Sequence, residues 1–200
     1  MKNLIVVTGA TGTVGSEVVR KLSEKGAHIR ACVHSAAKAD KIRGAGAEIA
    51  EMDYTNTDSI EKTLRGADKL FLLTPFHPDM VDMSRRLVDA AKRTGISRIV
   101  KLSVMGADAE PGISAGRWHR EAENMIIDSG IPYTLLRPNF FMQNLANFFG
   151  SYIRQGSLHL PCADGKTSFV DARDIAAVAA EALAKEGFEY RNSTINKPCP

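Results

Sequence analysis

The sequence has few cysteines, and they form no recognisable cluster. Only three occur among its 200 residues, Cys32, Cys162 and Cys199, far apart, with no CxxC pair and no histidine cluster at zinc-ligand spacing. We therefore expect no disulfide framework and no metal site, and the composition indicates a reducing compartment such as the cytoplasm. A chain of this length can bury a sizeable hydrophobic core without such cross-links.

Long apolar runs and a strong charge of one sign are also missing. The run Leu4-Ile5-Val6-Val7 is too short for a signal-peptide core, and no stretch approaches bilayer length, so no membrane partner is expected. The net charge of +3 comes from lysines and arginines scattered among acidic residues. Because there is no basic stripe with interleaved aromatic residues, nucleic acid is not an expected partner either.

What the sequence does have is a series of short apolar runs with helical patterns between them. The runs are continuous rather than alternating, as in Leu70-Phe71-Leu72-Leu73, which is typical of strands buried on both faces. The order predicts an α/β fold with a doubly wound, mainly parallel sheet and helices on both faces. The predicted strands are residues 4–8, 29–34, 48–53, 70–74, 99–103 and 133–137.

Glycines and capping residues mark the ends of the predicted helices. Gly26, Gly66, Gly95 and Gly130 recur just before the next strand, each as a left-handed helix cap. Asp171 precedes an alanine-rich amphipathic helix over 172–184, and its carboxylate can meet the free amides of the first turn, as can that of Asp174.

Residues 192–200 are polar, contain two prolines and have no periodicity, so they are expected to be a short strand or a loose tail.

A glycine-rich segment lies between the first strand and the first helix. In Thr8-Gly9-Ala10-Thr11-Gly12-Thr13-Val14-Gly15 the first glycine permits the tight exit from the strand, the second lets a diphosphate approach the backbone, and the third lets helix and sheet pack closely. A bound anion would then meet free amides at the positive end of the helix dipole. No GK[ST] follows, which excludes a Walker-type loop.

The end of the second strand bears on the choice of nucleotide. NAD-preferring proteins of this architecture carry an acidic residue about twenty positions past the loop, where this chain has Val33-His34-Ser35. His34 and Ser35, with Lys38 one turn further, can bind a 2′-phosphate, so NADP(H) is preferred over NAD(H). The alternative is that His34 is an exposed strand-end residue and Lys38 a solvated one.

Two further strand ends carry candidate ligand contacts. Asp53 can hydrogen-bond the adenine amino group with Tyr54 beside it, or it can cap the helix that begins near Thr57. Thr74-Pro75-Phe76 ends the fourth strand at the carboxyl edge of the sheet, where open α/β folds bind ligands, although the proline can simply stop the strand.

Six motifs occur in order along the chain: the glycine segment, Leu73-Thr74-Pro75, Lys101-Leu102-Ser103, His119-Arg120-Glu121-Ala122-Glu123, residues 132–138, and residues 169–174. Together they resemble the NmrA-like family of atypical short-chain dehydrogenases/reductases, especially its NAD(P)H:quinone oxidoreductase branch. The resemblance implies the Rossmann NAD(P)-binding fold, with residues 1–155 as the NAD(P)-binding domain and residues 156–200 as a partial or truncated substrate lobe with a returning helix. The resemblance implies that Gly9, Thr11, Gly12, Thr13 and Val14 contact the diphosphate; His34 and Lys38 the 2′-phosphate; Asp53 the adenine; Thr74, Pro75 and Phe76 the nicotinamide ribose side; Pro138, Asn139 and Phe140 the nicotinamide; and His119 its ribose.

The sequence lacks the Tyr-xxx-Lys pair of orthodox short-chain reductases. With Glu123 as register mark, the tyrosine position holds Ala115 and the lysine position holds His119. The remaining candidate acids are His119, whose ordinary pKa allows proton donation near neutrality, and Ser103. Placed beside Trp118 at a helix start, His119 can equally be a surface or ribose-contact residue.

The expected activity is hydride transfer from NADPH to a quinone-like acceptor, which needs little acid assistance. Phe140, Phe141, Phe148 and Phe149 can stack on a flat ring, or serve the core or a homodimer face. The alternative is a non-catalytic, redox-sensing NAD(P)-binding regulator; a sugar-nucleotide epimerase would need the missing tyrosine. Family members usually continue past the position of Pro200, so part of the pocket lid is expected to be absent.

Overall fold

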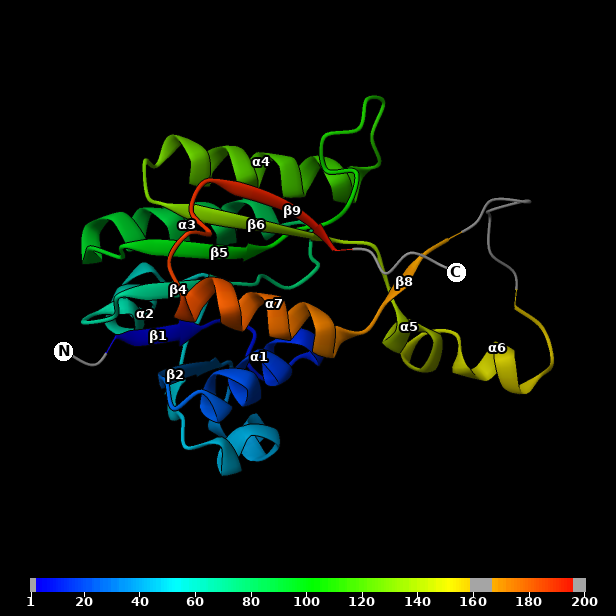
Figure 1. Ribbon diagram of the computed structural model, residues 1–200, viewed down its shortest axis with the longest axis horizontal. Coiled ribbons are helices and arrows are strands. Elements are labelled where there is room, and N and C mark those ends of the chain that lie inside the picture. Colours follow the sequence, from blue (N-terminus) through cyan, green and yellow to red (C-terminus); the bar gives the residue numbers. More distant parts are fainter. Residues whose placement is uncertain (1–2, 159–166, 196–200) are drawn as a thin grey trace.

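A seven-stranded parallel sheet forms the centre of the molecule (Figure 1), in the order β3-β2-β1-β4-β5-β6-β9. The computed structural model describes residues 3–158 and 167–195. The strands are β1 Leu4–Val7, β2 His28–Val33, β3 Glu48–Glu51, β4 Lys69–Leu72, β5 Arg98–Leu102, β6 Tyr133–Pro138 and β9 Arg191–Ile195. The strand order, which runs outward from β1 in both directions, confirms the predicted doubly wound fold.

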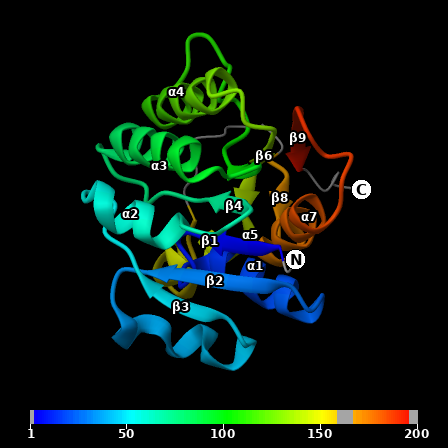
Figure 2. The same cartoon turned by 90° about the vertical axis from the view of Figure 1, so that its left-hand side faces the viewer.

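Helices cover both faces of this sheet. In Figure 2, α2, α3 and α4 lie on one face, and α1 and α7 lie on the other. The bounds are α1 Thr13–Glu24, α2 Thr57–Leu64, α3 Met80–Thr94, α4 Ser114–Asp128 and α7 Ala172–Ala184, with a 3-10 helix, η1, at Ala36–Ala45. Across residues 3–158 and 167–195, none of the helices has the length and apolar content needed to cross a bilayer.

The predicted helix ends agree with the structure. The four glycines proposed as caps, Gly26, Gly66, Gly95 and Gly130, all have a positive φ. At the start of α7, the Asp171 carboxylate accepts from the Arg173 backbone N–H at 2.8 Å, as the sequence predicted.

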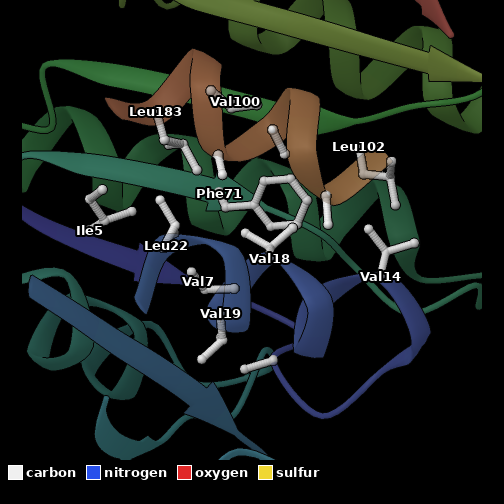
Figure 3. Close-up of a cluster of buried hydrophobic side chains, with 14 of the residues drawn as sticks. Ile5, Val7, Val14, Val18, Val19, Leu22, Phe71, Val100, Leu102 and Leu183 are labelled. Carbon is white, nitrogen blue, oxygen red and sulfur yellow. The ribbon is translucent and has the colours of Figure 1, made fainter. Parts of the chain in front are cut away.

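The α1 and α7 layer packs through small residues against one large aromatic ring. Phe71 of β4 is completely buried between these helices (Figure 3), in contact with the apolar side of α1 that includes Val14 and Val18. The facing side of α7 consists mainly of alanines, among them Ala176 and Ala179. Small side chains allow the helix to lie close to its neighbours, which explains why the helix predicted over 172–184 is rich in alanine.

A small second unit projects beyond the carboxyl edge of the sheet. It holds β7 Phe140–Phe141, α5 Met142–Asn147, α6 Gly150–Arg154 and β8 Phe169–Val170. Strand β8 pairs with β7, and Gln143 bonds the start of α7, its Nε2 donating to Asp171 Oδ1 at 3.0 Å and its Oε1 accepting from the Ala172 N–H at 3.0 Å. These contacts fix the position of α5 over the edge of the sheet.

The chain after residue 155 returns to the main sheet. Helix α7 lies along α1, and β9 pairs with β6, with Ser193 opposite Leu136. Residues 191–195 therefore form the short strand that was one of the two expectations for this end. The rest of that segment, 196–200, and residues 159–166 of the expected substrate lobe lie outside the described residues.

Candidate functional site: a dinucleotide groove with an aromatic pocket

The glycine segment folds into a turn that only glycine permits at two of its positions. Gly9 has a φ of +64°, and a Cβ there would lie 2.5 Å from Leu73 Cδ2. A Cβ on Gly15 would lie 2.1 Å from the Gly9 carbonyl oxygen, closer than any real contact. These two glycines therefore let helix α1 begin directly against the turn.

The start of α1 has no side-chain cap. Gly12 is its N-cap residue and brings no side-chain hydrogen bond. The first-turn amides, including those of Thr13 and Val14, are the donors that a helix leaves without an intrahelical partner. Such an end, at the positive pole of the helix dipole, can bind a diphosphate. The cradle therefore fits the group that the glycine spacing predicted.

Thr8, which sequence reasoning did not single out, ties this loop to β4. Its buried hydroxyl donates to the Leu73 carbonyl at 2.9 Å and accepts from the Leu73 N–H at 2.8 Å. The Gly12 N–H donates to the Gly9 carbonyl at 3.0 Å. Contacts within the protein hold the loop in place, so the groove exists before any ligand binds.

Two pockets adjoin at this helix end and share Gly12 and Leu73 as lining residues. The smaller, of about 260 Å³, is lined by Gly9, Thr11, Gly12, Cys32, Val33, His34, Met52, Tyr54, Leu73 and Pro75. The larger, of about 570 Å³, contains most of the remaining predicted residues: Thr13, Val14, Thr74, Phe76, Ser103, His119, Pro138, Asn139 and Phe140. Two adjoining pockets on either side of a diphosphate cradle match the two halves of a dinucleotide.

The smaller pocket has an uncharged wall. Tyr54 donates its hydroxyl hydrogen to the Leu73 carbonyl at 3.0 Å, and burial raises the pKa of its phenol above the ordinary value. Burial also raises the pKa of the Cys32 thiol to about 12. Both groups therefore stay protonated near neutral pH, and together with Met52 they form a surface suited to a flat, neutral base.

Asp53 is not among the residues that line this pocket. Its carboxylate accepts from the backbone N–H and the hydroxyl of Thr55, both at 2.8 Å, and these bonds lower its pKa. The idea that Asp53 caps the following helix is wrong, because the N-cap of α2 is Asn56, which accepts from the Ser59 N–H at 3.1 Å. A Thr55 hydroxyl two residues away provides a local partner that the sequence pattern did not reveal.

Other predicted residues take different positions. His34 is exposed at the rim of the smaller pocket, whereas Ala10 is buried, with its N–H donating to the Cys32 carbonyl at 3.3 Å, and lines neither pocket. Lys38 falls within η1. Glu51, which sequence reasoning missed, accepts from the Ala36 N–H at 2.8 Å and so places a carboxylate at the start of η1.

Two buried polar atoms in the larger pocket lack partners among the described residues. They are Thr74 Oγ1 and His119 Nδ1. A buried polar atom without a hydrogen bond costs free energy. Both residues were predicted to contact the nicotinamide half of the cofactor, and the structure places both beside the same cavity.

A buried charge cluster lies beneath Ser103. The Ser103 hydroxyl donates to Glu123 Oε1 at 2.6 Å, and the Glu123 side chain is 1% exposed. Arg137 of β6 holds the same carboxylate with two bonds of 2.9 and 2.6 Å and donates to Asp108 at 2.7 Å. The Glu123 bonds raise the pKa of Arg137 further above its ordinary value. Because the Ser103 hydrogen points to Glu123, its oxygen is left as an acceptor toward the pocket.

Ala115 and His119 lie one turn apart on α4, and both line the larger pocket. The positions that matched tyrosine and lysine in orthodox short-chain reductases therefore both face the site. Burial, with a smaller effect from Lys101, lowers the pKa of His119 to about 3. The expectation that its ordinary pKa permits proton donation near neutrality is therefore wrong, and the ring is a neutral hydrogen-bonding group at pH 7.

Aromatic rings form the outer part of the larger pocket. Phe140 stacks on Phe149 with ring centroids 6.1 Å apart and meets Phe169 edge-on at 5.4 Å. At the rim, Phe148 is 69% exposed and Phe76 is 75% exposed, the latter 5.7 Å from the Trp118 ring. Residues that sequence reasoning did not place in the site also line this pocket: Leu102, Val104, Asn144 and Asn147. The wall suits a flat, largely apolar molecule.

The fold and groove define a Rossmann-type dinucleotide-binding protein. The chain matches the model of the NmrA-like family over residues 1–198 and belongs to that family. The resemblance found in the sequence motifs is thereby confirmed at the level of the whole chain.

Several relatives of the chain are named as reductases. The chain is 39% identical over 195 residues to the NAD(P)H azoreductase of Xenophilus azovorans, covering 98% of this chain and 68% of the relative. It is 31% identical over 189 residues to Quinone oxidoreductase 2 of Escherichia coli (strain K12), covering 93% of this chain and 66% of the relative. The structure of the Escherichia coli NADPH-dependent quinone oxidoreductase with NADPH matches with a TM-score of 0.88 and 30% identity, over 96% of this chain and 69% of that one. The chain thus spans about two thirds of the length of each of these proteins.

Proposed function

We propose that this protein is an NAD(P)H-dependent oxidoreductase that transfers hydride to a small planar acceptor of the quinone type. The observation that carries the proposal is the arrangement at Gly12. There the uncapped start of α1 lies between the smaller pocket, whose uncharged wall suits a flat base, and the larger pocket, which is lined by aromatic residues. The named reductase relatives support the same class of reaction.

The chain's own residues would hold the cofactor in an extended pose. Tyr54 and Met52 would face the adenine, the amides of Thr13 and Val14 the diphosphate, and Thr74 the nicotinamide half. We also propose that NADP(H) is preferred over NAD(H), because the exposed residue at the end of β2 is His34 and not a carboxylate. The buried free thiol of Cys32 accords with the cytoplasmic location that we propose.

The reaction requires an acceptor that tolerates a weak proton donor. Bound NADPH would supply the hydride. His119 would donate a hydrogen bond from its neutral ring to the acceptor oxygen, and Ser103 would offer an acceptor oxygen beside it. Ala115 provides no phenol, so the acceptor must leave a stabilised oxyanion when reduced, as a quinone does. Solvent at the open rim can then complete protonation.

One observation favours a second candidate function. Ala115 occupies the position where an acid would sit, which also suits a protein that binds the nucleotide without turnover and presents a ligand-dependent surface to a partner. Both this non-catalytic, redox-sensing role and the reductase role require the glycine loop to bind the nucleotide. Only the reductase also requires the larger pocket to bind an acceptor.

A single titration distinguishes these functions. The protein is titrated with NADPH and with NADH by calorimetry, and a simple benzoquinone is then added while the absorbance band of the reduced nicotinamide is followed. The reductase predicts tight NADPH binding followed by consumption that depends on the quinone. Binding without consumption by quinones or azo compounds favours the regulator, and failure to bind either nucleotide contradicts both.

A further inference from the structure

Lys101 is a completely buried lysine in the strand beneath the larger pocket. Its ammonium makes one described hydrogen bond, to the backbone carbonyl of Leu102 at 3.1 Å. A buried charge without a directly bonded carboxylate is costly to keep, so its location calls for an explanation. Burial lowers the pKa of Lys101 to about 8, and the nearby Glu123 acts in the opposite direction, so the ammonium form still predominates at neutral pH.

The geometry places Lys101 in a cluster with three groups of the site. Ser103 directly follows β5 and is two residues from Lys101, so the two side chains lie on the same side of the strand. His119 and Glu123 are one turn apart on α4 and share a helix face. The Ser103–Glu123 hydrogen bond of 2.6 Å joins these two faces. Arg137 from β6 and Asp108 from the loop after β5 complete the charged groups around Glu123.

The two ring nitrogens of His119 have different surroundings. Nδ1 is buried and has no partner among the described residues, while the side chain as a whole lines the pocket. A hydrogen on Nδ1 would be a buried donor without an acceptor, exposed to the repulsion of the ammonium. A lone pair on Nδ1 is instead favoured by that positive charge, which leaves the single hydrogen of the neutral ring on Nε2.

We propose that Lys101 is a positioning residue of this site: its buried ammonium fixes the ring hydrogen of His119 on Nε2, the nitrogen available to a ligand in the larger pocket. The catalytic consequence rests on the proposed function, whereas the position of the ring hydrogen does not. An acceptor oxygen would meet a fixed, uncharged donor that needs no reorganisation during the reaction.

Nuclear magnetic resonance of the full chain without ligand tests the first half of the proposal. Nitrogen-15 labelled histidine gives distinct two-bond correlations for each ring form, and His119→Gln identifies the signal among the five histidines. We expect the Nε2–H form, without protonation, from about pH 5.5 to 8. An Nδ1–H ring, or one that titrates near its ordinary pKa, overturns the proposal. No substitution of Lys101 is needed for this result.

Lys101→Met tests the cause, with Lys69→Met as the matched control. Lys69 is the buried lysine of the adjacent strand, but its ammonium donates to the Leu183 carbonyl at 2.6 Å, on the α7 side of the sheet. We expect the Lys101 variant to mix the two ring forms of His119 and the Lys69 variant to leave the ring unchanged. Equal ring signals in both variants would mean that Lys101 does not set the tautomer.

Kinetics with NADPH and a benzoquinone test the consequence. In Lys101→Met we expect kcat to fall about tenfold, while the NADPH Kd changes less than about twofold. In a His119→Gln background the same substitution should change kcat by less than about twofold, because Lys101 acts through the ring. A full tenfold loss in that background contradicts the positioning role. If no reductase activity exists, the proposed function fails and the ring measurement alone decides the inference.

Discussion

Gly12 and Gly15 illustrate how two neighbouring glycines can serve different purposes. Gly15 is buried at the contact between α1 and the turn, with the Gly9 oxygen 2.1 Å from where a Cβ would be. Gly12 has an ordinary φ of −78°, and a Cβ there would lie 3.2 Å from the same oxygen. Gly15 is thus required for packing, whereas Gly12 keeps the groove open above the helix start.

This difference predicts opposite effects of substitution by alanine. Gly15→Ala should lower the free energy of unfolding by ~3 kcal/mol through overpacking. Gly12→Ala should cost about 1 kcal/mol or less in stability but raise the NADPH Kd at least about tenfold, since the added methyl would separate the diphosphate from the amides. Urea unfolding and calorimetric titration measure the two effects. Equal losses of stability in both variants would contradict this division of roles.

His34 is the residue on which the nucleotide preference depends. It is exposed at the rim of the smaller pocket, at the end of β2. We predict that His34→Asp lowers NADPH affinity at least about tenfold and leaves NADH affinity equal or higher, because the new carboxylate repels a 2′-phosphate and can bind a ribose hydroxyl. The ratio of the two Kd values is the measurement.

His28→Asp is the matched control for this change. His28 is an exposed histidine at the opposite end of the same strand, remote from the pocket lining. The same alteration of net charge at this position should leave the NADPH to NADH ratio within about twofold. A similar shift in both variants would show a general charge effect, and no shift in either would remove His34 from the site.

At the scale of elements, the C-terminal end of α7 is held by two cations from the sheet. Arg98 of β5 donates to the carbonyl oxygens of Ala182, at 3.1 Å, and Lys185, and forms an ion pair with Glu189. Lys69 of β4 donates to the Leu183 carbonyl. These are the free carbonyls that every helix leaves at its end, and positive charges there also oppose the helix dipole. These hydrogen bonds join residues that are more than eighty positions apart in sequence.

Loss of this cap should be more costly than loss of an exposed ion pair. We predict that Arg98→Met lowers the free energy of unfolding by ~2–4 kcal/mol, because buried carbonyls and Glu189 lose their partner. Arg93→Met is the control: Arg93 pairs with Glu61 at the surface, with side chains 51% and 30% exposed, and its loss should cost about 1 kcal/mol or less. Urea unfolding of both variants gives the comparison, and equal losses would contradict the capping role.

For the whole molecule, the sequence predicted those features that a local pattern determines. Short apolar segments of strand length predicted the six strands β1 to β6, and the glycine spacing predicted the cradle at Gly9, Gly12 and Gly15. The charge cluster beneath the pocket was not predicted, because Lys101 and Glu123 come together only when α4 packs on β5. The ordinary pKa expected for His119 failed for the same reason: burial depends on tertiary packing, which residue type does not reveal.

Cys32 connects the smaller pocket to the stability of the whole molecule at high pH. Burial raises its pKa to about 12 in the folded chain, whereas an unfolded thiol ionises near pH 8.5. Above that pH the unfolded chain loses a proton that the folded chain keeps, so the stability contributed by Cys32 is complete below about pH 8.5 and is lost as the pH rises toward the folded value. The slope is ~1.4 kcal/mol per pH unit.

Cys32→Ala removes this linkage and leaves the other titrating groups in place. The difference in unfolding free energy between the wild-type protein and the variant should be constant from about pH 6 to 8, where it reports only lost packing, and should then shrink by about 2 kcal/mol between about pH 8 and 10. Urea unfolding under reducing conditions at each pH measures this difference. Since both chains share every other ionisable group, a difference that stays constant up to pH 10 would mean that the thiol is open to solvent, and the smaller pocket would then lack the uncharged wall proposed to bind the adenine.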